Sequence, residues 1–243
     1  MSGNQLWGVK LGNYSKEETY LLIDEALNLQ ASSVLTIATL NPEILLLAKD
    51  NSRYAEILNN FSLRVTDGFG LKLAGIIKRL KTGCRLTGVD LAEYILKKGL
   101  ENNLKIGIIY REEGLSSRSD LERFFKNKKV ELFAWSGAKS EIMSKNLQEK
   151  EILLVGLGAP EQEEFIFEIK QQLPNLKLAI GVGGTFDFWT GRKKRAPRWM
   201  QKLGLEWLGR LFLLPKGERS FRWQRVRKIW RSTGVFLFKV LFN

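Results

Sequence analysis

The chain has 243 residues, of which 44% are hydrophobic, so it holds enough apolar material for a packed core. Its formal charge of +13 comes entirely from residues 192–243, where fifteen Lys and Arg face two acidic residues, while the preceding residues hold 24 of each sign. One cysteine excludes an internal disulfide, and the absence of histidine excludes the most usual metal ligand and general base. No run approaches the ~20 apolar residues of a membrane-spanning helix, and residues 1–18 lack a signal-peptide pattern. We therefore expect a soluble or peripheral protein on the cytosolic side.

Segments typical of strands and helices alternate along the first 191 residues. A Ser-x-x-Glu capping box at Ser15 and Glu18 predicts a helix whose apolar face includes Leu22, Ala26 and Leu29. Six short apolar runs predict strands, at 33–39, 62–65, 104–110, 130–135, 151–158 and 176–184. Each run is followed by a polar or glycine-containing turn and a helix-like stretch. This order predicts an α/β fold, with a Rossmann-like, mostly parallel sheet, helices on both faces, and ligands beyond the carboxyl ends of the strands.

Polar residues follow the first two predicted strands. Thr39 and Asn41 stand where the first strand passes into a helix, and Asn41 before Pro42 is also a usual helix start. Asp67 and Gly68 follow the second strand, where the plainer interpretation is a tight turn. Both places are candidates for a binding site, and both plainer interpretations stay open.

The last two predicted strands end in glycines. Gly158 precedes a carboxylate-rich helix turn that contains Gln162, which in isolation would be a surface residue. Gly183 lets a ligand approach the backbone, and Asp187 follows it. Neither glycine belongs to a G-x-G-x-x-G run, so a dinucleotide fingerprint is weakly supported, and the phosphate-loop, zinc and Asp-x-Asp patterns are absent.

The basic C-terminal region also carries a helical stripe of apolar positions. Its members are three or four residues apart: Trp223, Val226, Trp230, Thr233, Leu237 and Val240. A basic amphipathic helix with tryptophan at its boundary is typical of segments that lie in an anionic bilayer interface, so Trp223, Val226, Trp230 and Leu237 are expected to face the membrane. The alternative is a helix that packs this stripe on the body, and the two arrangements can alternate. DNA would also suit the charge but would not explain the mixed aromatic and aliphatic stripe.

Five stretches together resemble the WecG/TagA/CpsF glycosyltransferases of bacteria. They are ATLNPEILLLA, VTDGFGLKLA, RLTGVDL, LLVGLGAPEQEEFI and GVGGTFDFWTGRKKRAPRWMQKLGLEWLGRLFLLP, in the family's order and spacing, within about residues 6–222. The resemblance implies inverting transfer of a sugar, typically N-acetylmannosamine or its uronic acid, from a UDP donor. The implied acceptor is a lipid-diphosphate-linked N-acetylglucosamine, in the synthesis of cell-surface polysaccharide or cell-wall teichoic acid.

The resemblance also implies roles for particular residues. Asp67 matches the family's proposed base, with Thr39 and Gln162 in the same pocket. Other matched substrate-binding positions are Asn41 and Arg85 nearby, Asp187 toward the nucleotide, and Arg210, Arg219 and Arg222 in the tail. The last two match an Arg-x-x-Arg pair less directly, because the chain reads PKGERSFR there and is two residues longer than the family pattern. Gly68, Gly158 and Gly183 would let a substrate approach the backbone.

Inverting transfer needs a base to take the proton of the acceptor hydroxyl as it attacks the anomeric carbon. Without histidine a carboxylate is the natural base, and Asp67 on a glycine turn suits this role, although it could instead bind hydroxyls of the acceptor sugar. Helix N-termini and arginines could neutralise the departing diphosphate. We therefore expect neither a metal nor a cofactor.

The expected organisation is an α/β catalytic body over residues 1–191 and a basic amphipathic helical appendage over 192–243. The expected partners are a UDP-sugar, a polyprenyl-diphosphate-linked sugar acceptor and an anionic membrane surface, with no nucleic acid, and a homo-oligomer stays open. The expected location is peripheral, at the cytoplasmic face of the bacterial membrane. Two alternative functions also stay open: a nicotinamide-dependent Rossmann enzyme and a nucleic-acid-binding protein.

Overall fold

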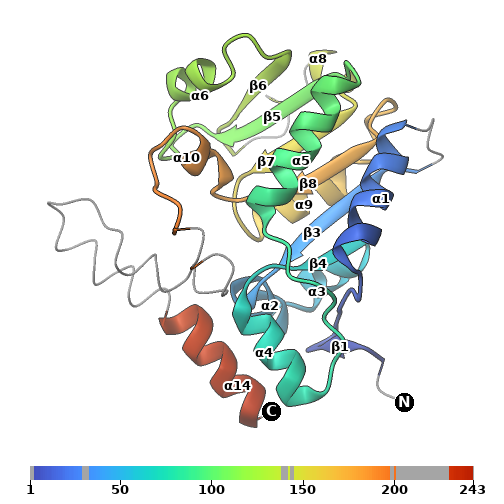
Figure 1. The fold of residues 1–243 in the computed structure, drawn as a ribbon, viewed down its shortest axis with the longest axis vertical. Helices are drawn as coiled ribbons and strands as arrows, with labels where there is room; N and C mark the ends of the chain where they lie inside the picture. The colour runs from blue at the N-terminus through green and yellow to red at the C-terminus, as the bar shows by residue number, and fades with distance from the viewer. Residues whose placement is uncertain are drawn as a thin grey trace, which may run out of the picture.

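The computed structural model describes residues 3–28, 33–137, 142, 145–197, 200 and 230–242 (Figure 1). Its centre is a six-stranded sheet in the order β4-β3-β8-β7-β5-β6, in which all neighbouring strands are parallel. The strands are β3 (Leu35–Leu40), β4 (Leu63–Thr66), β5 (Ile106–Arg111), β6 (Val130–Trp135), β7 (Ile152–Gly156) and β8 (Leu178–Gly181). A short antiparallel hairpin precedes them, formed by β1 (Gln5–Leu6) and β2 (Val9–Lys10). The predicted α/β class and the parallel sheet are confirmed.

Two predicted strands end earlier in the structure than in the sequence analysis. The runs 151–158 and 176–184 leave the sheet at Gly156 and Gly181. The cause is the backbone at Gly158 and Gly183, whose φ angles of 83° and 50° are incompatible with an extended strand. The chain therefore turns just beyond the carboxyl ends of β7 and β8.

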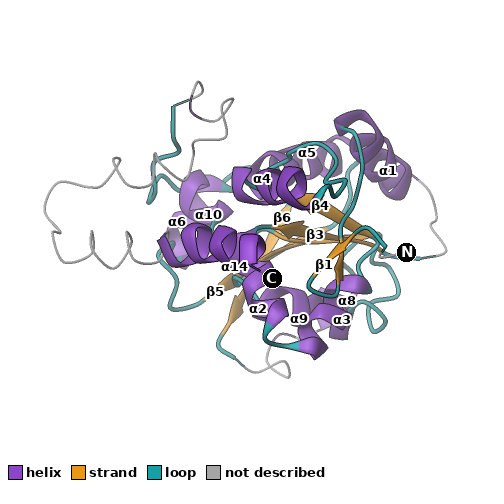
Figure 2. Ribbon diagram, turned by 90° about the horizontal axis from the view of Figure 1, so that it is seen from below, coloured by secondary structure: helices purple, strands orange, loops and turns teal. Residues whose placement is uncertain are grey.

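Helices cover both faces of the sheet, as predicted. They are α1 (Lys16–Asn28), α2 (Pro42–Lys49), α3 (Ser52–Asn59), α4 (Phe69–Lys78), α5 (Gly88–Glu101), α6 (Arg118–Phe124), α8 (Lys145–Gln148), α9 (Glu161–Ile169), α10 (Thr185–Trp189), a π-helical segment η1 (Trp230–Val235) and α14 (Phe236–Phe242). Figure 2 shows α1 and α5 on one side of the sheet and α2, α3 and α9 on the other. The sheet is thus the middle of three layers.

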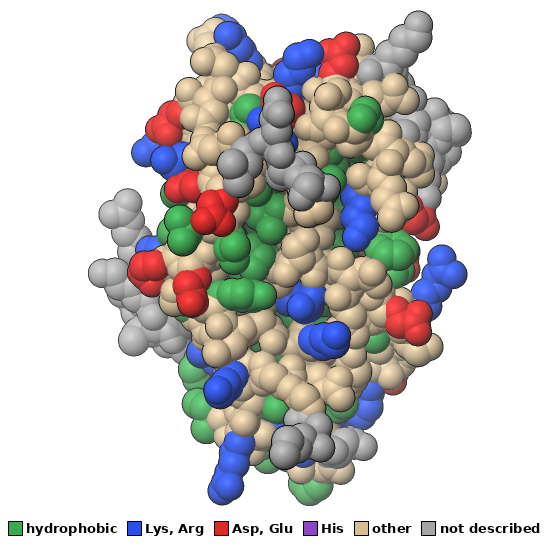
Figure 3. All heavy atoms as spheres, turned by 90° about the vertical axis from the view of Figure 1, so that its right-hand side faces the viewer, with side chains coloured by type: hydrophobic (Ala, Val, Ile, Leu, Met, Phe, Trp, Pro, Cys, Tyr) green, Lys and Arg blue, Asp and Glu red, His purple; other side chains and the backbone are tan. Residues whose placement is uncertain are grey.

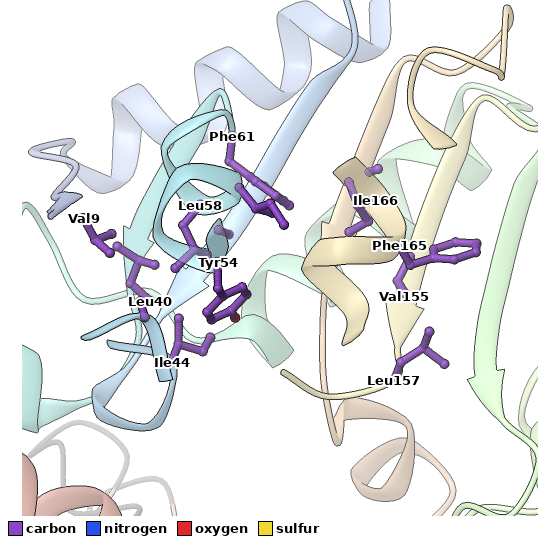
Figure 4. Packing of buried hydrophobic residues seen from close by; sticks show 14 of the residues in the cluster. Val9, Leu40, Ile44, Tyr54, Leu58, Phe61, Val155, Leu157, Phe165 and Ile166 are labelled. Atoms are coloured by element: carbon purple, nitrogen blue, oxygen red, sulfur yellow. The ribbon is translucent and has the colours of Figure 1, made fainter. Parts of the chain in front are cut away.

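Alternating side chains of the strands feed two hydrophobic clusters, one on each face. In β7, Leu153 and Val155 belong to the cluster beneath α2, α3 and α9, whereas Ile152 and Leu154 belong to the cluster beneath α1 and α5. Figure 4 shows the first cluster, in which Leu40 lies among side chains of α2 and α3, and Val155 lies beside Phe165 of α9. Both faces of the sheet are therefore buried under helices, as is usual for a parallel sheet.

The predicted start of the first helix is confirmed by its hydrogen bonds. The backbone N of Ser15 donates to Glu18 Oε2 at 2.7 Å, and the backbone N of Glu18 donates to Ser15 Oγ at 3.0 Å, which completes the capping box of α1. The buried face of α1 includes Ala26, as predicted, but Ile23 lies deeper than Leu22 and is fully buried. Leu29 lies outside the described residues.

The C-terminal helix packs on the body. α14 and η1 contact α2 and α4, and Phe236 and Val240 are fully buried (Figures 1 and 2). The ring of Phe236 meets Trp7 of the N-terminal hairpin edge-on, with 5.4 Å between ring centroids. Because Phe236 and Val240 lie four residues apart, they share one face of the helix. This segment therefore adopts the packed alternative of the two arrangements that its sequence leaves open.

The predicted membrane-facing residues differ in where the structure places them. Leu237 is half-buried against the core. Trp223 and Val226 lie outside the described residues, as does the side chain of Trp230. The exposed apolar side chains of α14 are instead Phe238, Leu241 and Phe242. None of the helices within the described part of the chain is long and apolar enough to cross a membrane.

Charges of both signs are scattered over the face that carries α1 (Figure 3). This mixture agrees with the balance of 24 basic and 24 acidic residues before residue 192.

Candidate active site

The candidate site lies along the edge formed by the carboxyl ends of the parallel strands. Asn41 follows β3, Asp67 follows β4, and the glycine turns follow β7 and β8. Because these strands run in the same direction, residues that are far apart in sequence meet at this edge. The first two positions form one half of the site and the glycine turns form the other.

Asp67 is fixed by its backbone and lies at the start of a long helix. Its backbone N donates to Leu40 O at 2.7 Å, and its Oδ2 accepts from the backbone N of Gly88 at 3.4 Å. Gly88 is the first residue of α5, whose N-terminus favours a negative charge. The side chain of Asp67 is half-buried. It is therefore a carboxylate held at the rim of the sheet rather than within the core.

Thr39, Asn41 and Arg85 lie next to Asp67 through the backbone pairing of β3, β4 and the bridge at Arg85. The buried Thr39 donates to Gly181 O at 3.4 Å, and a Cβ at Gly88 would lie 3.6 Å from Thr39 Oγ1, so Thr39 packs under the start of α5. Arg85 is half-buried and pairs with Thr66, the last residue of β4. Asn41 accepts from the backbone N of Ile44 at 3.0 Å, which confirms it as the N-cap of α2. The structure thus brings these predicted residues together with Asp67.

Gly68 confirms the turn that the sequence predicts after β4. Its φ angle is 96°, and a Cβ added there would meet no atom within 4 Å. The backbone conformation, rather than crowding by neighbouring atoms, is what requires glycine. The turn leads directly into α4.

In the second half of the site, Gln162 joins the two glycine turns. Its Oε1 accepts from the backbone N of Gly158 at 3.2 Å and from the backbone N of Gly183 at 2.9 Å. Its Nε2 donates to Glu163 Oε1 at 2.7 Å. Only 3% of Gln162 is exposed, so the surface interpretation of this residue is wrong. Its position is central to the site, but its amide is occupied by protein groups.

A cavity of about 190 Å³ opens beside these turns. The residues of its wall that matter most for binding are Arg111, Ser116, Gly156, Gly158, Gly183 and Asp187. Gly158 and Gly183 have open or nearly open space where a side chain would stand, so a flat or phosphorylated ligand can approach the backbone closely. The cavity therefore joins the glycine turns to the predicted nucleotide-side residue Asp187.

Asp187 is held by two neighbouring groups. Ser116 Oγ donates to its Oδ1 at 2.9 Å, and Lys193 forms an ion pair with its Oδ2. The backbone N of Lys193 also donates to the carbonyl O of Asp187 at 2.7 Å. Asp187 is thus a part of the cavity wall whose carboxylate is held in one orientation by protein groups.

The first residues of the predicted appendage are tied to the body by ion pairs. Arg192 makes a two-point contact with Asp120, at 2.9 and 2.8 Å, and Arg195 contacts Asp90 at 2.7 Å. Arg195 also donates to Thr87 Oγ1, the N-cap of α5, at 3.2 Å. Arg192, Lys193 and Arg195 therefore lie across the carboxyl edge and pair with acidic residues of the body. Arg210, Arg219 and Arg222 lie outside the described residues.

Sequence reasoning missed one fully buried acid in this region. Glu163 accepts from Gln162 and, through Oε2, from the hydroxyl of Tyr54 at 2.8 Å. Burial raises the pKa of Glu163 to about 7, although the hydrogen bonds from Gln162 and Tyr54 oppose this shift. Burial and the neighbouring Glu163 raise the pKa of Tyr54 as well. The acidic first turn of α9 suggests only a helix-dipole role, so the sequence offers no signal for this partner.

Within the described residues, no group of three or more His, Cys, Asp and Glu side chains is arranged to hold a metal ion. The acidic side chains of the site are instead bound to protein donors, as Asp187 is to Ser116 and Lys193. The expectation of a metal-independent reaction stays a prediction.

Comparison with known proteins gives consistent results. The family model described as "Glycosyl transferase WecG/TagA/CpsF family" matches residues 4–242. The chain is 31% identical over 206 residues to the N-acetylglucosaminyldiphosphoundecaprenol N-acetyl-beta-D-mannosaminyltransferase of Bacillus subtilis (strain 168), covering 79% of this chain and 75% of that protein. It is 28% identical over 216 residues to the enzyme of the same name from Staphylococcus aureus (strain MRSA252), covering 87% and 81%.

The family match includes nearly all of the basic C-terminal region, because it extends to residue 242. The tail therefore belongs to the family pattern together with the sheet and the glycine turns. The match favours glycosyl transfer over the nicotinamide-dependent and nucleic-acid-binding alternatives. The chain belongs to the glycosyl transferase WecG/TagA/CpsF family.

Proposed function

We propose that this glycosyltransferase moves N-acetylmannosamine from UDP to N-acetylglucosamine on a polyprenyl diphosphate, with inversion. The names of the relatives supply the sugar and the acceptor. The observation that supports this reaction most directly is the position of Asp67. It is a half-buried carboxylate at the carboxyl edge of the sheet, 3.4 Å from the first amide of α5 and on the same edge as the glycine-lined cavity.

In the proposed reaction, Asp67 acts as the general base. The acceptor hydroxyl attacks the anomeric carbon of the donor sugar while its proton moves to the Asp67 carboxylate. The bond between the anomeric carbon and the diphosphate oxygen breaks, and UDP leaves with the bonding electrons. A single displacement from the opposite face inverts the anomeric carbon.

The cavity beside the glycine turns is the proposed nucleotide site. Gly158, Gly183 and Gly184 leave the backbone bare there, which permits close approach of a diphosphate or a ribose. Asp187 can accept hydrogen bonds from ribose or base, because an ionised carboxylate is only an acceptor. Positive charge for the leaving diphosphate would come from Arg85 and from Arg210, Arg219 and Arg222 of the tail.

Two adjacent helices support peripheral binding to a membrane. α4 and α14 contact each other and lie side by side in Figures 1 and 2. Their exposed apolar side chains are Phe69, Ile76, Ile77, Phe238, Leu241 and Phe242. The proposed orientation places this surface on the anionic cytoplasmic leaflet, where the polyprenyl acceptor resides and where the basic tail adds electrostatic attraction.

The membrane proposal is tested by liposome sedimentation. The double variant Ile76→Glu/Phe242→Glu should bind anionic liposomes much more weakly than the wild type, because it places two carboxylates on the proposed contact. Leu21→Glu is the matched control, since Leu21 is 58% exposed on α1, away from α4 and α14. Equal binding by both variants would show that the surface of α4 and α14 does not contact the membrane.

The reaction is tested with a panel of UDP-sugars and a short-chain lipid-diphosphate N-acetylglucosamine. We expect mass spectrometry to find an acceptor enlarged by one N-acetylhexosamine only with UDP-N-acetylmannosamine, and NMR to find the inverted anomer. Transfer from a different UDP-sugar would replace the donor assignment. Retention of the anomeric configuration would remove the single-displacement role of Asp67.

A further inference from the structure

A chain of buried hydrogen bonds connects α3 to both glycine turns of the site. The hydroxyl of Tyr54 donates to Glu163 at 2.8 Å, and Gln162 donates to the other oxygen of the same carboxylate at 2.7 Å. Gln162 Oε1 then accepts from the amides of Gly158 and Gly183. Tyr54 and Glu163 are fully buried, so water does not compete for these bonds.

The chain has a fixed polarity because an amide side chain has two chemically different ends. Two backbone N–H groups face Gln162 from the turns, and they need its oxygen rather than its NH₂ group. The NH₂ group must then find an acceptor on the opposite side, and ionised Glu163 is an acceptor only. Rotation of the amide by half a turn would set its NH₂ group against the two N–H donors of the turns and its oxygen against the acceptor oxygen of Glu163. Glu163 therefore determines which end of Gln162 meets the glycines.

The space around Gln162 is also fitted to this orientation. A Cβ at Gly181 would lie 2.7 Å from Gln162 Nε2, which is too close for a real contact. Gly158 and Gly183 have positive φ angles, and both line the cavity. Because Oε1 of Gln162 already accepts two hydrogen bonds, its lone pairs are used to hold the turns rather than a substrate.

We infer that Tyr54 and Glu163 are positioning residues that set the amide orientation of Gln162, and through it the spacing of the two glycine turns that bind the donor diphosphate or nucleotide. The inference rests on the proposed function for its ligand, UDP, but the hydrogen-bond geometry stands without it. Gln162 then acts on the substrate through the position of the two turns, whose amides it holds, and not by touching the reacting atoms.

An exchange of the two side chains tests this inference. In Gln162→Glu, two carboxylates face each other, so Glu163 must stay protonated to donate. In the double variant Gln162→Glu/Glu163→Gln, the new amide donates to the new carboxylate and accepts from Tyr54, while the carboxylate still accepts from both glycine amides. The double variant therefore preserves every donor and acceptor of the wild type, and only the charge moves by one residue.

Purified variants would be compared by kcat and by KM for the UDP-sugar. We expect Gln162→Glu to lose about tenfold to a hundredfold in kcat/KM, the scale of a misplaced binding loop. The loss should grow between about pH 6 and about pH 9, because Glu163 then loses the proton with which it donates to the second carboxylate. The charged and titratable groups around this site are Glu164 on α9, Tyr54 on α3 and Glu43 on α2. The double variant should regain about tenfold, as expected within one hydrogen-bond network.

Amide hydrogen exchange provides a readout that is independent of activity. Tyr54→Phe and Gln162→Glu should each speed exchange at Gly158 and Gly183, and the double exchange variant should restore protection. Glu164→Gln is the matched control, because Glu164 is an acid of the same helix that is not fully buried. Failure of the double variant to restore both protection and kcat/KM would overturn the inference. Restored protection without any transferase activity in the wild type would overturn the proposed function and leave the positioning of the turns intact.

Discussion

The two halves of the carboxyl edge use their polar residues in opposite ways. Around β3 and β4, Asp67 presents a half-buried carboxylate at the rim of the sheet. Around β7 and β8, Gln162 and Glu163 are buried, and their hydrogen bonds go to other protein groups. The comparison suggests that the first half supplies reacting groups, whereas the second half supplies a rigid shape against which a nucleotide can bind.

The same contrast explains why the buried acid need not be a catalyst. A raised pKa often marks a catalytic carboxyl group, but Glu163 is fully buried and is bonded to Gln162 and Tyr54. A group that cannot reach a substrate cannot transfer a proton to it. Its burial is instead the means by which a single amide orientation is selected.

Replacement of Asp67 should have the largest effect. Asp67→Asn is nearly isosteric but abolishes basicity, and loss of a general base typically costs ~10² to 10⁴ in rate. We expect kcat to fall by this amount while UDP binding, measured by calorimetry, stays unchanged, because the second half of the site is untouched. Turnover above half that of the wild type would show that Asp67 is not the base.

Replacement of Glu163 should change how stability depends on pH. The pKa of Glu163 is raised from the ordinary 4.5 to about 7 in the folded protein, so the folded state binds the proton more tightly than the unfolded state. The contribution of Glu163 is thus most favourable below pH 4.5 and is lost as the pH rises to about 7. A shift of this size corresponds to about 3 kcal/mol of unfolding free energy.

Glu163→Gln should remove this part of the pH dependence. Urea unfolding of both proteins between pH 4.5 and 7 would give the two slopes. We expect the unfolding free energy of the wild type to fall relative to that of the variant as the pH rises, because only the wild type has to ionise a buried carboxyl group. Parallel curves would show that Glu163 titrates as an ordinary surface acid.

A change at Gly156 should affect only the second half of the site. A Cβ at this position would overlap the ring of Phe186 and would lie 3.1 Å from Gly183 O. Gly156→Ala should therefore cost about 1 to 3 kcal/mol of stability by overpacking and weaken UDP binding by narrowing the cavity. Gly3→Ala is the matched control, because a Cβ there meets no atom within 4 Å. Equal melting temperatures for the two variants would contradict the crowding at Gly156.

The sequence predicts the sheet and the first half of the site well, because both depend on local signals. Asn41 before Pro42 and Asp67 before Gly68 are short patterns with a physical meaning, and the structure has a helix cap and a turn at these places. The parallel strands then bring the two segments together without any further information. In this half, short sequence patterns together with the parallel strand order are enough to predict which residues lie close together.

The second half is harder to predict because its partners are distant in sequence. Tyr54 and Glu163 are separated by 109 residues, and neither belongs to a pattern that suggests burial of an acid. The packing of Phe236 against Trp7 is equally remote. An amphipathic stripe specifies that one face of a helix must be covered, but whether a membrane or the body covers it depends on tertiary contacts.

Removal of divalent metal should have the smallest effect of all. No described group of acidic, histidine or cysteine residues is arranged to hold an ion, and Asp187 is already held by Ser116 and Lys193. In the proposed reaction, arginine side chains stabilise the leaving diphosphate, so transfer should proceed at an unchanged rate in EDTA. Initial rates with and without EDTA, each after dialysis, would check this. A sharp loss that Mg²⁺ or Mn²⁺ restores would mean that the diphosphate needs a metal as well as the glycine turns, and the second half of the site would then supply an ion-binding surface in addition to its shape.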